Sequence, residues 1–210
     1  MANFTNFLQS ASPASPPPAP GAVSRPRVIV GISGASGSCY GIRLLEMLRD
    51  LDVETHLVLT PAAVLTLRHE TGFSQDEVQA RASRAHDAEN LAAPIASGSF
   101  PTLGMIVAPC SIRSMSAIAS GNTATLLTRA ADVILKERRR LILMVRETPL
   151  HLGHLRTMTA LTEMGAIIAP PVPAFYAKPQ SLAEMVDHTL GRVLDLLNLD
   201  SPTAPRWEGG

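Results

Sequence analysis

The chain has 210 residues, of which 46% are hydrophobic and 17% charged, so it is long enough for one sizeable core and is not disordered as a whole. Its 18 lysine and arginine residues balance 18 aspartate and glutamate residues, which argues against a global field that favours nucleic acid or an anionic membrane. Two cysteines are too few for a disulfide framework, and no stretch approaches the roughly eighteen apolar residues of a membrane span.

The first 26 residues differ in composition from the rest. The segment SASPASPPPAPGAVSRP is rich in proline, alanine and serine and has little to bury, so we expect a disordered tail over residues 1–26. It lacks the apolar core of a signal peptide, and its first arginine is Arg25, so neither a secretory nor a mitochondrial address is indicated. We expect a single domain over residues 27–210 and a cytoplasmic location.

Beyond the tail, short apolar runs alternate with longer amphipathic segments. This alternation predicts an α/β fold of Rossmann-like, flavodoxin-like type, with a mostly parallel sheet and helices on both faces. The predicted strands span residues 27–32, 53–59, 104–108, 141–145 and 166–169. The predicted helices span residues 36–50, 61–70, 112–120, 124–137, 152–164 and 181–198.

The turn after the first predicted strand, in VIVGISGASGSCYG, is rich in small residues. Gly34, Ala35, Ser36 and Gly37 would let a phosphate approach the backbone at the start of a helix, where N–H groups are unpaired. The spacing G-x-x-G-x-x-G differs from the dinucleotide fingerprint G-x-G-x-x-G and favours a mononucleotide over NAD. The alternative is a tight connection that binds nothing.

Three further turns follow predicted strands and should share an edge of the sheet with the glycine-rich turn. Thr60 ends the second strand, PCSIRS follows the third, and the Arg-Glu pair at residues 146–147 follows the fourth. Ligands in these folds collect beyond the carboxyl ends of the strands, so the turns predict a site for a phosphate and a heterocycle. Each hydroxyl taken singly could instead be a helix cap. The side chains concerned are Ser36, Thr60, Ser111, Ser114, Arg113 and Arg146.

Four segments together resemble the flavin prenyltransferase family, the UbiX and Pad1 proteins. They are GISGASGSCYGIRLLEML, ASGSF…GMIVAPCSIRS, RAADVILKERRRLILMVRETPLHLGHL and PPVPAFYAKPQS, and the resemblance covers nearly all of the chain from Arg27 onward. It implies transfer of a dimethylallyl group from dimethylallyl phosphate to N5 and C6 of reduced FMN. The product, prenylated FMN, would serve a partner UbiD-type decarboxylase, and the assembly would be a homododecamer.

The resemblance also implies site residues, position by position. The family's FMN contacts fall on Gly34, Ala35, Ser36, Thr60, Ser111, Ile112, Arg113, Ser114 and Arg146. Contacts to dimethylallyl phosphate fall on Tyr176 and Arg192, assisted by Arg129 and Lys136. Acidic positions of the family match Glu70 and Glu147, which with Ser36 are the candidate catalytic residues. Some members carry a tryptophan just before the ASGS segment, where this chain reads ENLAAPIASGS.

The chemistry of the residues explains why no metal motif is needed. Ionising an allylic phosphate requires tight binding of anionic oxygens, which arginine, lysine and tyrosine can provide. A monophosphate carries less charge than a diphosphate, so side-chain cations can replace a magnesium cluster. His151 and His154 could suggest a metal site, but no cysteine or carboxylate completes the set nearby, and we interpret them as a helix start.

Other motifs have plainer interpretations. The basic run KERRR, residues 136–140, lies between a helix and a strand and is expected to be solvated or to face another subunit, with Lys136 as the exception. Cys110 could be a nucleophile beside a helix start, but packing of a small side chain is favoured.

Two rival functions remain open from the sequence. One is an FMN-dependent enzyme of the cysteine-decarboxylase type, and the other is a non-catalytic FMN-binding subunit of an aromatic acid decarboxylase. The prenyltransferase is favoured because a carrier would not need a pocket for an allylic phosphate.

Overall fold

The structure, a computed structural model, describes residues 25–200, and residues 1–24 and 201–210 lie outside that range. The predicted tail over residues 1–26 therefore falls almost wholly outside the described residues. The remainder confirms the α/β prediction, with a sheet in which each paired strand is parallel to its neighbour. Its strands are β1 (Arg27–Ile32), β2 (Glu54–Leu59), β3 (Arg84–His86), β4 (Gly104–Cys110), β5 (Arg140–Val145) and β6 (Ala166–Ile168).

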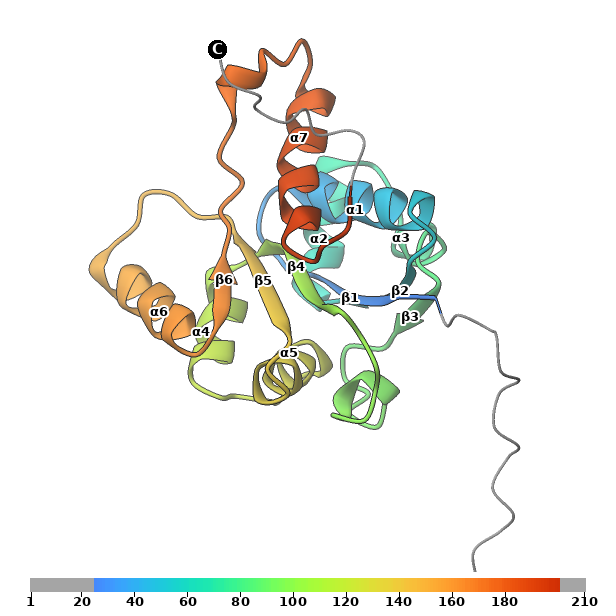
Figure 1. Ribbon diagram of the computed structural model, residues 1–210, viewed down its shortest axis with the longest axis vertical. Coiled ribbons are helices and arrows are strands. Elements are labelled where there is room, and N and C mark those ends of the chain that lie inside the picture. Colours follow the sequence, from blue (N-terminus) through green and yellow to red (C-terminus); the bar gives the residue numbers. More distant parts are fainter. Residues whose placement is uncertain (1–24, 201–210) are drawn as a thin grey trace, which may run out of the picture.

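Helices cover both faces of this sheet (Figure 1). One core cluster joins α1, α2 and α7 to the sheet, and the other joins α4 and α5 to the opposite face. The helices are α1 (Ser38–Asp50), α2 (Pro61–Glu70), α3 (Gln75–Gln79), α4 (Ile112–Ala119), α5 (Leu126–Lys136), α6 (Leu152–Glu163) and α7 (Leu182–Asp195). Short 3₁₀ turns occur at η2 (Pro94–Ala96) and η3 (Phe175–Ala177).

The strand order is β3-β2-β1-β4-β5-β6. From β1 the chain moves outward to β2 and β3, and it then returns to place β4 on the other side of β1. The connections beyond β1 and β4 therefore diverge, and a crevice forms between them at the carboxyl ends of these strands, which is where ligands bind in such sheets. The fold thus places the turns after β1 and β4 side by side.

The sequence misses β3 and α3. Both are short and polar, since β3 reads RAH and α3 reads QDEVQ with only Val78 buried. The central strands, by contrast, are covered on both faces and form nearly continuous apolar runs, so β4 is buried throughout. The hydrophobic pattern finds the apolar strands, including β6 at one edge of the sheet, and overlooks the short polar strand β3 at the other edge.

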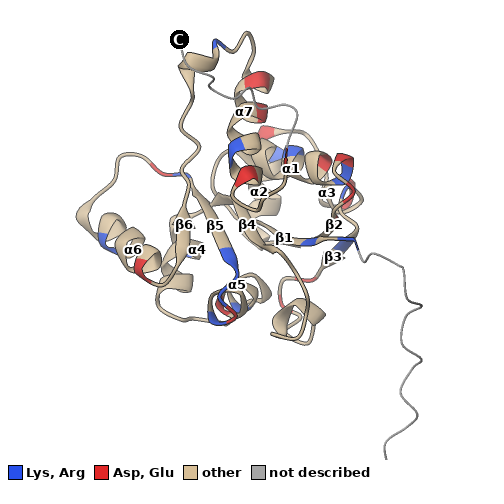
Figure 2. Cartoon of the chain, viewed as in Figure 1, with Lys and Arg blue, Asp and Glu red and all other residues tan. Residues whose placement is uncertain are grey.

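No helix within residues 25–200 has the length and apolar character needed to cross a membrane. Basic and acidic residues intermingle over the ribbon instead of gathering into separate regions (Figure 2). This distribution agrees with the balanced composition of the chain.

Candidate functional site

The turn between β1 and α1 leaves little room for side chains. Gly34 lies against the start of α2, where an added Cβ would collide with Ala62. Gly37 precedes α1 with a φ of 103°, a left-handed conformation that costs glycine little. Two of the predicted glycines are therefore required by the geometry of the turn itself, whether or not a ligand binds there.

Two of the predicted hydroxyls cap helices. Thr60 Oγ1 accepts a hydrogen bond from Ala63 N–H at 3.2 Å at the start of α2. Ser111 Oγ accepts from Ser114 N–H at 3.2 Å at the start of α4. The cap alternative is correct for both residues, and both also line a cavity, so the two roles coexist.

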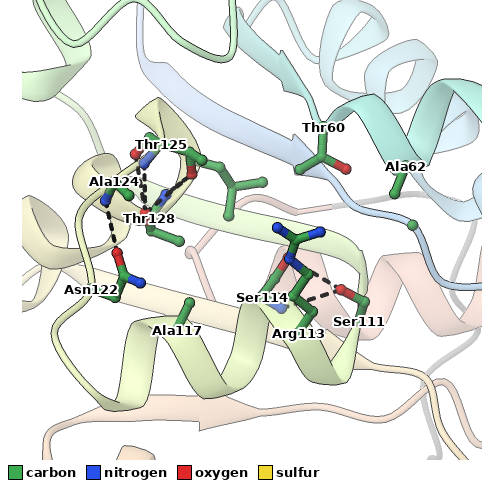
Figure 3. A pocket seen from close by; sticks show the side chains of 12 residues that line it. Thr60, Ala62, Ser111, Arg113, Ser114, Ala117, Asn122, Ala124, Thr125 and Thr128 are labelled. Carbon is green, nitrogen blue, oxygen red and sulfur yellow. Dashed lines mark hydrogen bonds between the residues drawn. The ribbon is translucent and has the colours of Figure 1, made fainter.

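A cavity of about 250 Å³ lies beyond the carboxyl ends of the central strands, between the starts of α2 and α4 and the connection from α4 to α5 (Figure 3). Predicted hydroxyl and arginine side chains alternate around it with small apolar ones. A ring system can pack against the apolar surfaces while hydroxyl and guanidinium groups bind its polar substituents. The lining residues are Gly34, Thr60, Ala62, Ser111, Arg113, Ser114, Ala117, Asn122, Ala124, Thr125, Leu127 and Thr128.

The sequence predicts five of these lining residues and misses the rest. The missed wall comes mainly from the start of α5, where Thr125 and Thr128 form a reciprocal cap. Because α5 follows another helix, the rule that strands end at the site does not select it. A signal was nonetheless present, since a threonine before an amphipathic helix is typical of a helix start.

Two arginines at this edge have no hydrogen bond or ion pair through their side chains within the part of the chain that is described. The Arg113 guanidinium extends from the first turn of α4 into the space below Thr60 (Figure 3). Arg146 directly follows β5, is exposed, and donates its backbone N–H to the Cys110 carbonyl at 3.1 Å. Two guanidinium forks are therefore free to bind an anion at the end of neighbouring strands.

Glu70 binds the start of α1. Its Oε2 accepts from the N–H groups of Gly37 and Ser38, both at 2.9 Å. Partial burial raises the pKa of this carboxyl, but hydrogen bonds from Ser36 Oγ and from the two N–H groups lower it more, so the pKa lies below its usual value. The N–H groups at the start of α1, which we expected to meet a ligand phosphate, thus bind the ionised form of Glu70. They also hold the Glu70 carboxylate beside Ser36.

Several predicted residues lie near this edge without lining the cavity. Ile112 packs against the core beneath α4, and Ala35 is buried. Glu147 is exposed, and its Oε1 accepts from Thr148 N–H at 3.0 Å. Their predicted roles remain proposals.

The expected phosphate ligands on α5 lie apart from the cavity and have protein partners. Arg129 donates from Nε to the Ala96 carbonyl at 3.2 Å and from NH1 to Asp132 at 2.8 Å. Lys136 pairs with the neighbouring Glu137 at the end of α5. Both side chains face the segment 96–100 that contains the ASGS motif. Arg129 binds the Ala96 carbonyl, and a Cβ on Gly98 would collide with Lys136 and Glu137.

The other two expected phosphate ligands lie on a different part of the chain. Residues 170–181 form a segment that projects away from the sheet before α7 returns to α1 (Figure 1). Tyr176 lies in this projecting segment, where its hydroxyl is 3.4 Å from His188 Nε2, and Arg192 pairs with Asp195 at 2.6 Å. Tyr176 and Arg192 thus lie on η3 and α7, whereas Arg129 and Lys136 lie on α5, so the expected phosphate ligands come from separate parts of the chain.

The basic run KERRR has a structural role that the sequence does not predict. Arg139 donates to the carbonyls of Phe100 at 2.7 Å and Gly98 at 2.9 Å. It is partly buried by these contacts and fixes the segment 96–100 against the end of α5. The expectation of a fully solvated end is therefore wrong for Arg139, whereas an end that faces another subunit stays a prediction.

The remaining motifs follow their plainer interpretations. Cys110 is buried, and burial raises the pKa of its thiol to about 12, which favours packing over nucleophilic catalysis. His151 precedes α6 and accepts from Gly153 N–H at 3.0 Å, as expected of a helix start. Among the described residues, no group of three or more histidine, cysteine or acidic side chains is placed to hold a metal ion.

Comparisons with known proteins cover most of the chain. The family model described as Flavoprotein matches residues 18–195. Flavin prenyltransferase UbiX of Escherichia coli (strain K12) is 60% identical over 186 residues, which is 87% of this chain and 98% of that protein.

Solved structures agree with the sequence comparison. The crystal structure of AnUbiX (PadA1) in complex with FMN and dimethylallyl pyrophosphate is 48% identical, with a TM-score of 0.87 over 89% of this chain and 99% of that one. A dodecameric FMN-dependent UbiX-like decarboxylase from Escherichia coli O157:H7 is 46% identical, with a TM-score of 0.85 over 87% of this chain and 100% of that one. The cysteine decarboxylase TvaF is 18% identical over 69% of this chain and 90% of that one, and its TM-score of 0.57 reflects a shared fold alone.

Proposed function

The chain belongs to the Flavoprotein family as a flavin prenyltransferase of the UbiX type, and from this premise we propose how its residues divide the work of the reaction. It acts with FMN and transfers a dimethylallyl group. We propose, as the family resemblance implies, that this group joins N5 and C6 of reduced FMN. We place the flavin in the cavity at the ends of β1 and β4, because hydroxyls, small apolar side chains and Arg113 line it.

The residues present fit the flavin. The edge offers hydroxyls at Thr60, Ser111 and Ser114, and the free guanidinium groups of Arg113 and Arg146 supply charge for a phosphate monoester. Reduced FMN supplies the nucleophile when bound. The chain therefore needs to orient two substrates, exclude water and bind the phosphate that is released.

We assign proton handling to Ser36 and Glu70. The bonds from Gly37 and Ser38 keep Glu70 ionised, so this carboxylate is prepared to accept a proton or to stabilise positive charge on the allylic group. The Ser36 hydroxyl beside it can pass a proton toward it. Glu147, next to Arg146, is a second acidic group of the proposed site.

We infer that the site for dimethylallyl phosphate is completed by neighbouring copies of the chain. Lys136 and Arg129 lie on α5 beside the segment 96–100, whereas Tyr176 lies on the projecting segment beside His188. The segment also exposes large apolar side chains, with 70% of Val172, 74% of Phe175 and 79% of the adjoining Leu182 accessible. A dodecamer, the assembly of the UbiX-like relative, would cover this surface and bring Tyr176 to another chain.

We also propose that prenylated FMN passes to a UbiD-type decarboxylase and that the chain acts in the cytoplasm as one FMN-binding domain from residue 27 onward. Its two cysteines are free, which suits a reducing compartment.

The defining experiment incubates the protein with reduced FMN and either dimethylallyl phosphate or dimethylallyl pyrophosphate, followed by mass spectrometry of the extracted flavin. We expect a five-carbon addition with the monophosphate. Flavin recovered unchanged with both donors would instead support a non-catalytic FMN-binding subunit. Release of carbon dioxide from a peptide with a carboxyl-terminal cysteine would support the cysteine-decarboxylase type.

Co-expression of two impaired variants, assayed at low dimethylallyl phosphate, tests the shared site. Lys136→Ala and Arg192→Ala should each impair prenyl transfer, and hybrids that contain both should regain activity, because some sites then receive both native side chains. If the two residues serve a site within one chain, hybrids have no such sites and activity stays at the level of the single variants.

A further inference from the structure

Ser33 joins the two turns that border the candidate flavin site. It follows β1, and its exposed fraction is 0%. Its Oγ donates to the Pro109 carbonyl at 2.9 Å and accepts from Ser111 N–H at 2.7 Å, while its own N–H donates to the Pro109 carbonyl at 3.2 Å. One side chain therefore uses both its donor and its acceptor on the turn after β4.

These bonds fall where the sheet itself provides no pairing. The register between β1 and β4 ends at Gly31 and Val107, so the residues beyond are held by other contacts. Ser111 N–H lies just before α4 and outside its helical hydrogen bonds, and because Ser111 is partly buried, loss of its acceptor would be costly. Ser33 Oγ is that acceptor, so it fixes the start of α4 relative to β1.

Residues on both sides of the cavity directly follow the two turns that Ser33 joins. Gly34 is the next residue after Ser33, and Ser111 is followed in the first turn of α4 by Arg113 and Ser114. We propose that Ser33 is a positioning residue for the flavin site: by holding the turns after β1 and β4 in register, it sets the affinity for FMN without contacting the cofactor. The proposal rests on the assignment of this cavity to FMN.

A matched control exists at the opposite end of the same two strands. Thr102 Oγ1 donates to the Arg27 carbonyl at 2.8 Å and to the Gly104 carbonyl at 3.0 Å, and it accepts from Gly104 N–H at 3.3 Å. It therefore joins the amino ends of β1 and β4 by hydroxyl bonds of the same kind. Thr102→Val removes them while keeping the shape of the side chain.

The experiment compares Ser33→Ala, Ser33→Thr and Thr102→Val with the parent, in the full chain. FMN affinity is measured by quenching of flavin fluorescence, well below the unfolding temperature of each variant. Ser33→Ala should weaken FMN binding on the order of tenfold, as expected when a partly buried N–H loses its acceptor. Ser33→Thr, which keeps the hydroxyl, should remain within about threefold of the parent, and Thr102→Val should lower the unfolding temperature with unchanged FMN affinity.

Two further readouts locate the effect. In Ser33→Ala, the KM for FMN in prenyl transfer should rise at constant kcat, because binding changes while the reacting groups stay in place. Amide hydrogen exchange should accelerate in peptides that cover residues 109–116, whereas Thr102→Val should accelerate exchange only around residues 100–106.

Three outcomes would overturn the proposal. Ser33→Ala could bind FMN as the parent does, Ser33→Thr could bind no better than Ser33→Ala, or Thr102→Val could weaken FMN binding as much as Ser33→Ala. A parent protein that does not bind FMN would instead contradict the assignment of the cavity, so the two failures are distinguishable.

Discussion

The basic residues of the proposed active site fall into two groups with opposite surroundings. Arg113 and Arg146, at the ends of β4 and β5, have no hydrogen bond or ion pair through their side chains in residues 25–200. Arg129, Lys136 and Arg192 already pair with neighbouring acidic side chains. The first group is ready to bind an anion in a single chain, whereas the second must exchange partners or gain a neighbouring subunit. The flavin half of the site is thus more complete within one chain than the allylic phosphate half.

Glu70→Gln should give the largest effect and should separate chemistry from binding. The amide retains an oxygen that can accept from Gly37 and Ser38, so FMN should still bind. Loss of the carboxylate should lower kcat for prenyl transfer on the order of a hundredfold. The measurement is single-turnover formation of prenylated FMN beside an FMN titration. A variant with the parent's rate would limit Glu70 to fixing the start of α1.

The same variant has a pH signature. Because the folded protein lowers the pKa of Glu70, its ionised form stabilises the fold above the unfolded pKa of about 4.3, and that stability is lost as the pH falls through the lower folded pKa. The difference in unfolding temperature between parent and Glu70→Gln should be present near neutral pH and should shrink below about pH 4.3. A difference independent of pH would show that the charge of Glu70 does not contribute.

Arg146→Ala probes the unpaired group directly. Removal of one charge-assisted contact should weaken FMN binding by about ten- to a hundredfold. Riboflavin, which lacks the phosphate, should bind parent and variant alike if the guanidinium meets that group. Arg129→Ala is the control from the paired group and should leave FMN affinity unchanged. Equal losses for FMN and riboflavin would place Arg146 elsewhere on the flavin.

Tyr176→Phe probes the allylic phosphate half of the proposed site and should have a smaller effect. Deletion of one neutral donor should raise the KM for dimethylallyl phosphate by several-fold, since a single hydrogen bond contributes about 1 kcal/mol. Arg192→Ala should act in the same direction more strongly, and FMN affinity should be unchanged in both. If saturation with dimethylallyl phosphate is normal in both variants, the proposed phosphate site on these residues is wrong.

A network of side chains that already bind one another lies on β2 and β3, and it contrasts with the unpaired arginines of the flavin site. His56 Nδ1 lies 2.9 Å from His86 Nε2, and His56 Nε2 lies 3.0 Å from Glu54 Oε1. Arg27 and Arg84 also contact Glu54, and the Phe100 ring packs edge-on against His56. These groups have one another as partners, so we expect them to act on stability and not on ligand binding.

Burial lowers the pKa of both imidazoles, and the Glu54 bond opposes this only for His56. Between the lowered folded pKa and the unfolded value of about 6.5, the unfolded chain binds more protons, so stability should fall as the pH drops below about 6.5. His86→Gln keeps an N–H for His56 and removes one titrating ring, so thermal unfolding between pH 7.5 and 5 should depend less on pH. An unchanged slope would exclude the histidine pair as its source, and FMN affinity serves as the control.

The regions of the molecule differ in how well the sequence predicts where their side chains lie. The four turns at the sheet edge follow from apolar runs that end in glycine, hydroxyl or arginine residues, and the parallel topology brings such ends together. The wall contributed by Thr125 and Thr128 follows a helix, so that rule does not reach it. The network of His56 and His86 depends on β3, whose polar sequence gives no strand signal.

The sequence by itself determined the fold class, the family and the turns that border the candidate site, because hydrophobic periodicity and local motifs are properties of neighbouring residues. Only the tertiary structure decided which of those side chains meet. It placed Glu70 on the N–H groups of α1 and let Ser33 join the turns after β1 and β4. These outcomes depend on hydrogen bonds between residues more than 30 positions apart, and such contacts are fixed only when the strands pack into one sheet.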